Sequence, residues 1–168
     1  FATKLLAWHG EDGRQGLPWQ SIRDPYAVWV SEIMLQQTQV ATVLERYPRF
    51  MKRFPTVKKL AAAPLDDVLA EWAGLGYYTR ARNLHACAKQ VMEEFGGKFP
   101  HDPILLEQLK GIGRSTAGAI AAFAFHERAP ILDANVKRIL ARLFGIEGAI
   151  QEKACLLYTS PSPRDRQK

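Results

Sequence analysis

Apolar residues recur along this chain at intervals of three and four positions, the spacing of one face of an α-helix. No stretch alternates apolar and polar residues as a half-buried β-strand would. The spacing predicts helices over residues 1–8, 26–38, 43–54, 57–63, 65–73, 79–95, 103–109, 114–125 and 134–144. We therefore predict an all-α fold, a bundle of about six short helices with a helical hairpin at one edge.

The helix over residues 26–38 has the sharpest start in the chain. Asp24-Pro25 supplies an N-cap followed by proline at the first helical position. Glu32 shares one face of this helix with Val28 and Leu35, beside the main apolar stripe. Burial among those side chains would raise the pKa of Glu32 and let it hold a proton near neutral pH. A solvated surface carboxylate is the alternative, and the spacing alone leaves both open.

The same helix ends in four polar, uncharged residues, Gln36-Gln37-Thr38-Gln39. Amide side chains both donate and accept hydrogen bonds, so at a helix tip they can meet base edges or fill a gap in a base stack. The alternative is a solvated helix end. Trp19, in a non-helical segment, also has two interpretations: a core anchor, or the wall of a pocket for a planar base.

A glycine-marked turn joins the helices over residues 103–109 and 114–125. Gly111 and Gly113 flank one apolar residue, and the free amides that open the second helix predict an anion site. Such a site can grip a nucleic-acid phosphate without reading sequence, although a plain helix corner has the same pattern. Asp133 is a good N-cap for the next helix. It also ends an apolar run, where a carboxylate is costly without a task or a partner.

A second glycine turn, Gly74–Tyr78, precedes a helix with Arg80 and Arg82 in its first turn. Basic residues are unfavourable at a helix N-terminus, which favours an outside anion as their partner. The whole chain has the same bias, because 23 Lys and Arg residues outnumber 17 Asp and Glu residues and give a net charge of +6. This excess suits a polyanionic partner.

Composition narrows the class of protein. A chain of 168 residues, 47% apolar and 24% charged, suits one soluble globular domain with a sizeable core. The longest apolar run, Ala117–Phe125, is too short to cross a bilayer, and we find no secretion signal. Cys87 and Cys155 are far apart, and the histidines show no ligand spacing. We expect no disulfide, metal or cofactor in this chain.

The motifs together resemble the helix-hairpin-helix DNA glycosylases. The string L-x-G-I-G-R-S-T-A, followed by P-I-L-D-A-N-V-K-R, carries the likeness. V-S-E-I-M-L-Q-Q-T-Q-V and G-L-G-Y-Y-x-R-A-R-N-L are similar to their adenine-removing, MutY-type branch. The resemblance covers about residues 1–146. It implies a monomeric enzyme of base excision repair, cytoplasmic and nucleoid-associated in a bacterium. Its substrate would be double-stranded DNA with adenine mispaired with guanine or 8-oxoguanine.

The resemblance also assigns roles to residues. Glu32 is the catalytic acid and Asp133 the stabiliser of an oxocarbenium-like sugar, a two-carboxylate logic, with support from Ser115 and Asn135. The adenine pocket is lined by Arg14, Trp19 and Leu35. The residues that enter the duplex or touch the lesion base are Gln37, Thr38 and Tyr77, the last with core packing as its alternative. The DNA phosphate is held by Gly111, Gly113, Arg114 and Ser115.

Two other functions stay open at this point. Glycosylase/AP lyases of the endonuclease III type act on damaged pyrimidines and carry a Schiff-base Lys where this chain has Ser115, which cannot form that imine. A helix-hairpin-helix module that binds DNA without catalysis is the second. Ala134 also departs from the family pattern, since many relatives have Gly there.

The resemblance implies a domain plan. Residues 1–21 begin an incomplete second, iron-sulfur-type helical domain, residues 22–130 form the six-helix hairpin domain, and residues 131–150 return to the second domain. We expect residues 151–168 to be a disordered or non-native tail, and the natural start to precede Phe1. Full-length relatives carry a 4Fe-4S cluster and an 8-oxoguanine-recognition domain, whose ligand cysteines and sequence are absent here. We expect a folded central bundle that binds DNA weakly and cleaves slowly or not at all.

Overall fold

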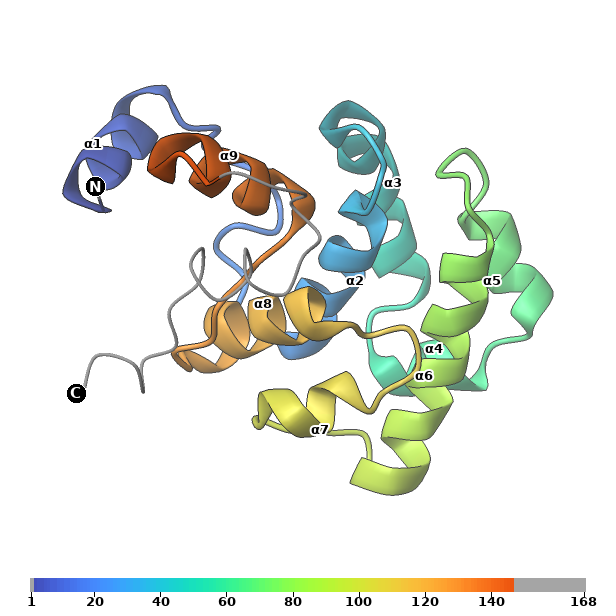
Figure 1. Cartoon of the computed structure of the whole chain (residues 1–168). Coiled ribbons are helices and arrows are strands. Elements are labelled where there is room, and N and C mark those ends of the chain that lie inside the picture. The colour runs from blue at the N-terminus through green and yellow to red at the C-terminus, as the bar shows by residue number, and fades with distance from the viewer. Residues whose placement is uncertain (1, 147–168) are drawn as a thin grey trace.

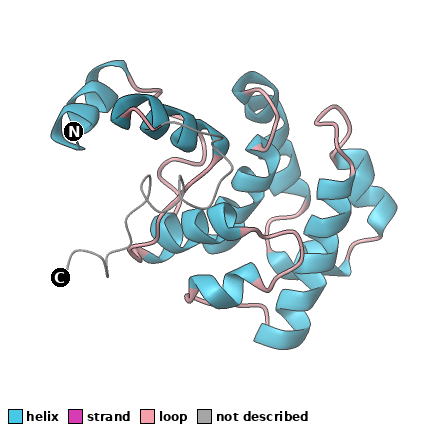
Figure 2. Cartoon of the chain, viewed as in Figure 1, coloured by secondary structure: helices cyan, strands magenta, loops and turns pink. Residues whose placement is uncertain are grey.

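The computed structural model describes residues 2–146, so the predicted tail at 151–168 and Cys155 lie outside the described residues. Within that range every regular element is a helix, which confirms the predicted all-α fold (Figures 1 and 2). The helices are α1 Ala2–Asp12, α2 Pro25–Leu35, α3 Val40–Arg53, α4 Val57–Ala62, α5 Leu65–Glu71, α6 Thr79–Phe95, α7 Pro103–Glu107, α8 Arg114–Phe125 and α9 Ala134–Phe144. None of the helices between residues 2 and 146 is long and apolar enough to cross a membrane.

Helix α2 is the centre of the core. It packs against α8, α3 and α6, while α6 in turn packs against α4 and α5. The predicted stripe of α2 is buried throughout, and the largest fully buried side chains of the core include Trp29, Phe50 and Trp72. The side chain of Asp24 accepts a hydrogen bond from the amide of Tyr26 and so caps α2 as predicted. Because α2 is held on most sides by the core, side chains on its uncovered face have fixed positions.

The sequence placed the end of α2 wrongly. The helix stops at Leu35 rather than near Thr38, because Gln36 is extended and Gln37 has a φ of +56°. The last carbonyls of α2 are satisfied by the side chain of Arg80, so no further helical turn is needed. Other bounds also moved: α1 reaches Asp12, α3 already begins at Val40, and α5 and α7 each end two residues early. The glutamines therefore lie in a loop beyond the helix tip.

The first and last helices bury little. In α1, Leu5, Leu6 and Trp8 are 47%, 72% and 54% exposed. In α9 the buried residue is Ala141, while large apolar side chains such as Phe144 are exposed. Figure 1 draws both helices on the side of the molecule away from α4–α6. The buried hydrophobic core lies almost entirely between Tyr26 and Ala121.

Candidate active site

Glu32 lies on the face of α2 that the core leaves partly free. Its side chain is half-buried, and burial raises the pKa of its carboxyl to about 7, with a further contribution from the negative charge of Asp133. The neighbouring Ser31 is buried, and its hydroxyl donates to the carbonyl of Val28 at 2.7 Å. Glu32 is therefore a desolvated carboxyl rather than the solvated surface residue that the spacing left open.

A cavity of about 730 Å³ opens beside Glu32 and gathers residues from four parts of the chain. They come from α2 and the loop after it, the turn before α6, the start of α8 and the start of α9. Its lining includes the predicted residues Glu32, Leu35, Gln37, Tyr77, Ser115, Asp133 and Asn135. The fold thus brings both carboxylates of the predicted pair into one space, although they are about a hundred residues apart in sequence.

Glu32 also lines a second cavity of about 520 Å³. Trp19 forms part of its wall and meets Tyr47 edge to face, with ring centroids 5.5 Å apart. Trp19 therefore packs on the core and also lines a pocket, and a planar base in that pocket stays a prediction. The sequence did not single out the remaining polar and aromatic lining, which is His9, Gln15, Gln20, Arg23 and Phe123.

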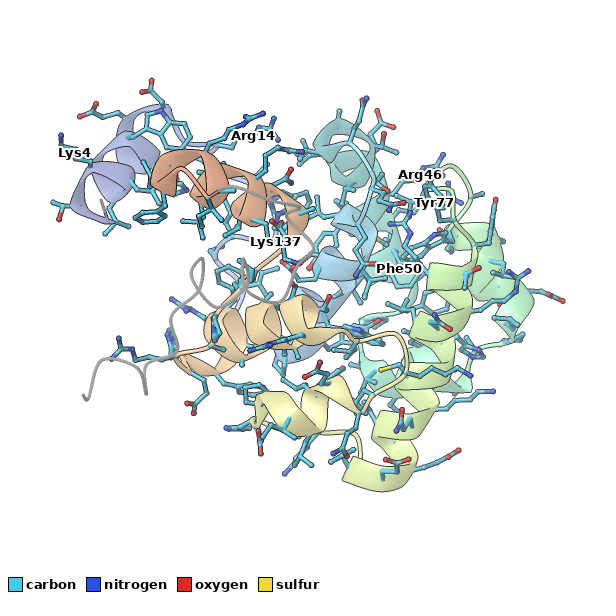
Figure 3. All side chains as sticks on the ribbon, viewed as in Figure 1. Lys4, Arg14, Arg46, Phe50, Tyr77 and Lys137 are labelled. Carbon is cyan, nitrogen blue, oxygen red and sulfur yellow. The ribbon has the colours of Figure 1, made fainter. Side chains whose placement is uncertain are left out.

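The predicted adenine pocket is split between these spaces. Trp19 lines the second cavity, whereas Leu35 lines the first. The side chain of Arg14 is exposed and lines neither, while its backbone carbonyl accepts a hydrogen bond from Gln20 at 2.6 Å. Figure 3 shows Arg14 on the loop after α1, well apart from Tyr77 at the turn before α6. Glu32 is the residue that the two spaces share.

Asp133 caps α9 as predicted: its Oδ1 accepts from the amide of Val136 at 2.7 Å. It is exposed, and a close approach of the preceding segment to α8 positions it. A side chain at Gly118 would place its Cβ 2.7 Å from the carbonyl oxygen of Pro130. Asn135 accepts a hydrogen bond from Arg138 and has no hydrogen bond to Asp133 in this structure. The supporting role of Asn135 stays a prediction, since the two side chains form no hydrogen bond with each other here.

Of the two hairpin glycines, only Gly111 is at a position where the backbone requires glycine. Gly111 has a φ of +80° and packs so closely on Asn83 that a Cβ would lie 2.8 Å from the Asn83 Cβ. Gly113 has an ordinary φ and begins α8, and a Cβ there would face open space. Arg114 is exposed beside it. The start of α8 is thus exposed, and a helix start has free amides that can bind an anion.

Three predicted DNA-contacting residues occupy the two loops at the cavity edge. Gln37 and Tyr77 are exposed and both have left-handed backbone, with φ values of +56° and +47°. Thr38 does not line the cavity, because its hydroxyl is engaged with the carbonyl of Leu75 and with Arg80. The outside-anion prediction for Arg80 was wrong. Its guanidinium turns inward and donates to the carbonyls of Gln36 and Leu75, one in each loop.

Residues 30–158 match the family model described as HhH-GPD superfamily base excision DNA repair protein. The chain belongs to this superfamily. It is 50% identical over 146 residues to an adenine DNA glycosylase of Buchnera aphidicola subsp. Baizongia pistaciae, covering 87% of this chain and 42% of the relative. It is 46% identical over 155 residues to the adenine DNA glycosylase of Mus musculus, covering 87% and 30%. The chain thus spans less than half the length of these relatives.

Solved structures share the fold of this HhH-GPD member. A thermostable thymine-DNA glycosylase superposes with a TM-score of 0.86 at 27% identity, covering 99% of this chain and 79% of that one. A trapped endonuclease III-DNA covalent intermediate superposes with a TM-score of 0.79 at 21% identity, covering 98% and 76%. The predicted helix-hairpin-helix glycosylase fold is confirmed.

An iron-sulfur cluster of the 4Fe-4S type needs four cysteine thiolates. Residues 2–146 contain one cysteine, Cys87, which is buried in the core, where burial raises the pKa of its thiol to about 12. No group of three or more His, Cys, Asp or Glu side chains in this range could hold a metal ion. The described residues of this HhH-GPD member therefore do not form such a cluster site.

Proposed function

We propose that this chain is the catalytic part of a monofunctional DNA glycosylase that removes adenine mispaired with guanine or 8-oxoguanine. The observation that carries the proposal is Glu32, a carboxyl whose pKa is raised to about 7, in one cavity with Asp133. A group that is half protonated near pH 7 is suited to general acid catalysis. Adenine is a poor leaving group until it is protonated, and protonated Glu32 would supply that proton.

The two carboxylates divide the chemistry. Glu32 donates its proton toward N7 of adenine as the N-glycosidic bond breaks, and the base leaves as neutral adenine. The sugar becomes oxocarbenium-like, and the exposed carboxylate of Asp133 stabilises its positive charge until water adds. The base must first leave the duplex. Gln37 would fill the space that the base vacates and Tyr77 would wedge beside the lesion base, and both are exposed at the cavity edge.

The relatives favour adenine as the base. Those at 46–50% identity are named adenine DNA glycosylases, both bacterial and mammalian. Ser115 argues against the lyase alternative, because a hydroxyl cannot form the Schiff base that an AP lyase needs. The raised pKa of Glu32 argues against a module that only binds DNA, since burying a carboxyl costs stability without helping phosphate binding.

The partner in this proposal is double-stranded DNA with an A:G or A:8-oxoguanine pair, bound by a monomer. The net charge of +6 and the outward-facing start of α8 support it. Full-length relatives would add a 4Fe-4S domain. In a bacterium, the enzyme would work on the nucleoid in the cytoplasm.

A single-turnover assay tests the proposal. An excess of the 168-residue chain is incubated with a duplex holding one adenine opposite 8-oxoguanine, and free adenine is measured. Glu32→Gln should slow release by ~10²–10⁴-fold, the usual loss when a general acid is removed. Glu93→Gln, an exposed glutamate on α6, is the matched control and should leave the rate unchanged. Release at more than about a tenth of the original rate in Glu32→Gln removes Glu32 from the acid role.

A further inference from the structure

Arg80 lies in the first turn of α6, and its guanidinium is turned inward. Nη1 donates to the carbonyls of Ile33 at 2.9 Å and Met34 at 3.1 Å, and also to the carbonyl of Gln36. These carbonyls belong to the C-terminal end of α2, which leaves unpaired acceptors and a partial negative charge. The guanidinium of Arg80, from α6, therefore satisfies the C-terminal carbonyls of α2 as a capping group would.

The other terminal nitrogen of Arg80 binds a second loop. Nη2 donates to Thr38 Oγ1 at 3.0 Å and to the carbonyls of Leu75 and Gly76 at 2.8 and 3.2 Å. Trp72 supports the same turn, because its indole N–H donates to the carbonyl of Gly76 at 3.1 Å. One guanidinium thus joins residues 33–38 to residues 75–76.

The two loops joined in this way carry the exposed residues at the cavity edge. Gln37 and Tyr77 both have left-handed backbone, which non-glycine residues adopt only when their surroundings hold them there. The guanidinium also lies 5.7 Å from the Tyr77 ring and 5.4 Å from the Trp72 ring, within cation–π range. Removing the cross-link would let both loops relax to ordinary backbone.

We infer that Arg80 is a positioning residue that locks residues 36–38 and 75–77 into one unit and so presents Gln37 and Tyr77 together to DNA. What the pair does to DNA rests on the proposed function, whereas the locking stands on the contacts alone. Lysine cannot replace Arg80, because a single ammonium lacks the planar fork that reaches both loops. The locked unit lowers the cost of ordering these residues when a base leaves the duplex.

Hydrogen exchange tests the locking without DNA. In Arg80→Lys, which keeps the charge, the amides of Thr38 and Leu75 should exchange about tenfold faster or more, because their loops open locally. The core amides of Val30 and Ala88 should change by less than about twofold. Lys89→Gln removes a charge from the exposed face of the same helix and should leave all four amides unchanged.

A duplex with 2-aminopurine in place of the target adenine tests the consequence, since the fluorescence of this base rises when it unstacks. At saturating protein, Arg80→Lys should lose most of the rise seen with the unaltered chain. Its affinity for a matched duplex should stay within about twofold, because phosphate contacts are untouched. Lys89→Gln should keep the full rise.

Each outcome decides between the alternatives. Loop exchange equal to that of the unaltered chain overturns the locking, and so does equal acceleration in the core, which would make Arg80 a general stabiliser. Locally faster exchange with an undiminished fluorescence rise overturns the positioning of Gln37 and Tyr77. If the unaltered chain itself gives no rise, the proposed function fails, and the exchange experiment still decides whether Arg80 locks the loops.

Discussion

At Glu32 the proposed catalytic role and the stability of the fold make opposite demands. The unfolded chain titrates this carboxyl at its ordinary pKa of 4.5, whereas burial and the charge of Asp133 raise its pKa to about 7 in the folded chain. The folded form therefore binds the proton more tightly. This contribution to stability is complete below pH 4.5 and is lost as the pH rises through about 7. Glu32, the proposed acid, thus destabilises the fold when its carboxyl is ionised.

Glu32→Gln should remove this pH dependence. Glutamine has nearly the same shape and cannot ionise, so the variant should be more stable than the original chain at pH 8, by up to roughly 3 kcal/mol. At pH 5 the two free energies of unfolding should differ much less. Urea unfolding at both pH values measures this. A variant less stable than the original at pH 8 would show that the buried carboxylate is compensated in the folded chain.

The same pKa predicts a pH dependence for the proposed reaction. If protonated Glu32 is the acid, the single-turnover rate should fall as the pH rises through about 7, where the carboxyl loses its proton. Rates measured between pH 5.5 and 8.5 on one duplex give the profile. A rate that rises through this window instead would mean that Glu32 acts in its ionised form.

At the scale of elements, α8 does two tasks with its small residues. Its first turn faces outward at Gly113, and its middle receives the segment that leads to Asp133 at Gly118. The position of the second carboxylate therefore depends on a close backbone contact. A similar contact at Gly111 packs the hairpin turn on Asn83 of α6.

Gly118→Ala should therefore displace the segment that positions Asp133. Its Cβ would meet the Pro130 carbonyl oxygen at 2.7 Å, so the backbone must shift, at a cost of about 1–3 kcal/mol in the free energy of unfolding. Gly113→Ala is the matched control, because its Cβ faces open space and its φ is ordinary. Urea unfolding of both variants measures the difference. Equal stability would show that the segment before Asp133 moves aside freely.

Gly113→Val tests the outward face of the same helix. A branched side chain should keep phosphate from the amides of the first turn, so affinity should fall for matched and mismatched duplexes alike. The salt dependence of binding should fall by about one phosphate contact. Binding titrations at several salt concentrations measure both. A loss confined to mismatched DNA would contradict the phosphate role.

For the whole molecule, burial is unequal along the described chain. Helix α2 is buried over most of its length, whereas the apolar side chains of α1 and α9 are largely exposed. Few buried contacts mean a low free energy of local opening. Asp133 stands at the start of α9, so the weakly packed part includes one of the two carboxylates.

Hydrogen exchange should follow this division. Amides in α2, α6 and α8 should be strongly protected, while those in α1 and α9 should exchange quickly, since little buried apolar surface holds these helices. Mass spectrometry of peptides covering residues 2–146 measures this. Protection of α1 and α9 equal to that of α2 would contradict it. It would also remove the reason to expect slow cleavage by this chain.

The sequence by itself predicted most helices and singled out Glu32 as the candidate acid. Helices α6, α8 and α9 lie where the spacing and the caps predicted, because capping residues and apolar periodicity act over a few neighbours. The two carboxylates were recognisable from their motifs. The burial of Glu32 could not be predicted, because helical spacing shows which residues share a face but not what packs against that face.

Only the tertiary structure decided how the site is assembled. Helix α2 can end at Leu35 because the side chain of Arg80, more than forty residues later in the chain, donates hydrogen bonds to its last carbonyls. The same arginine was predicted to face an outside anion, since its local position at a helix start says nothing about acceptors brought in from another helix. The division of the pocket around Glu32 likewise depends on which loops pack beside α2. Such long-range side-chain contacts leave no periodic signal in the sequence.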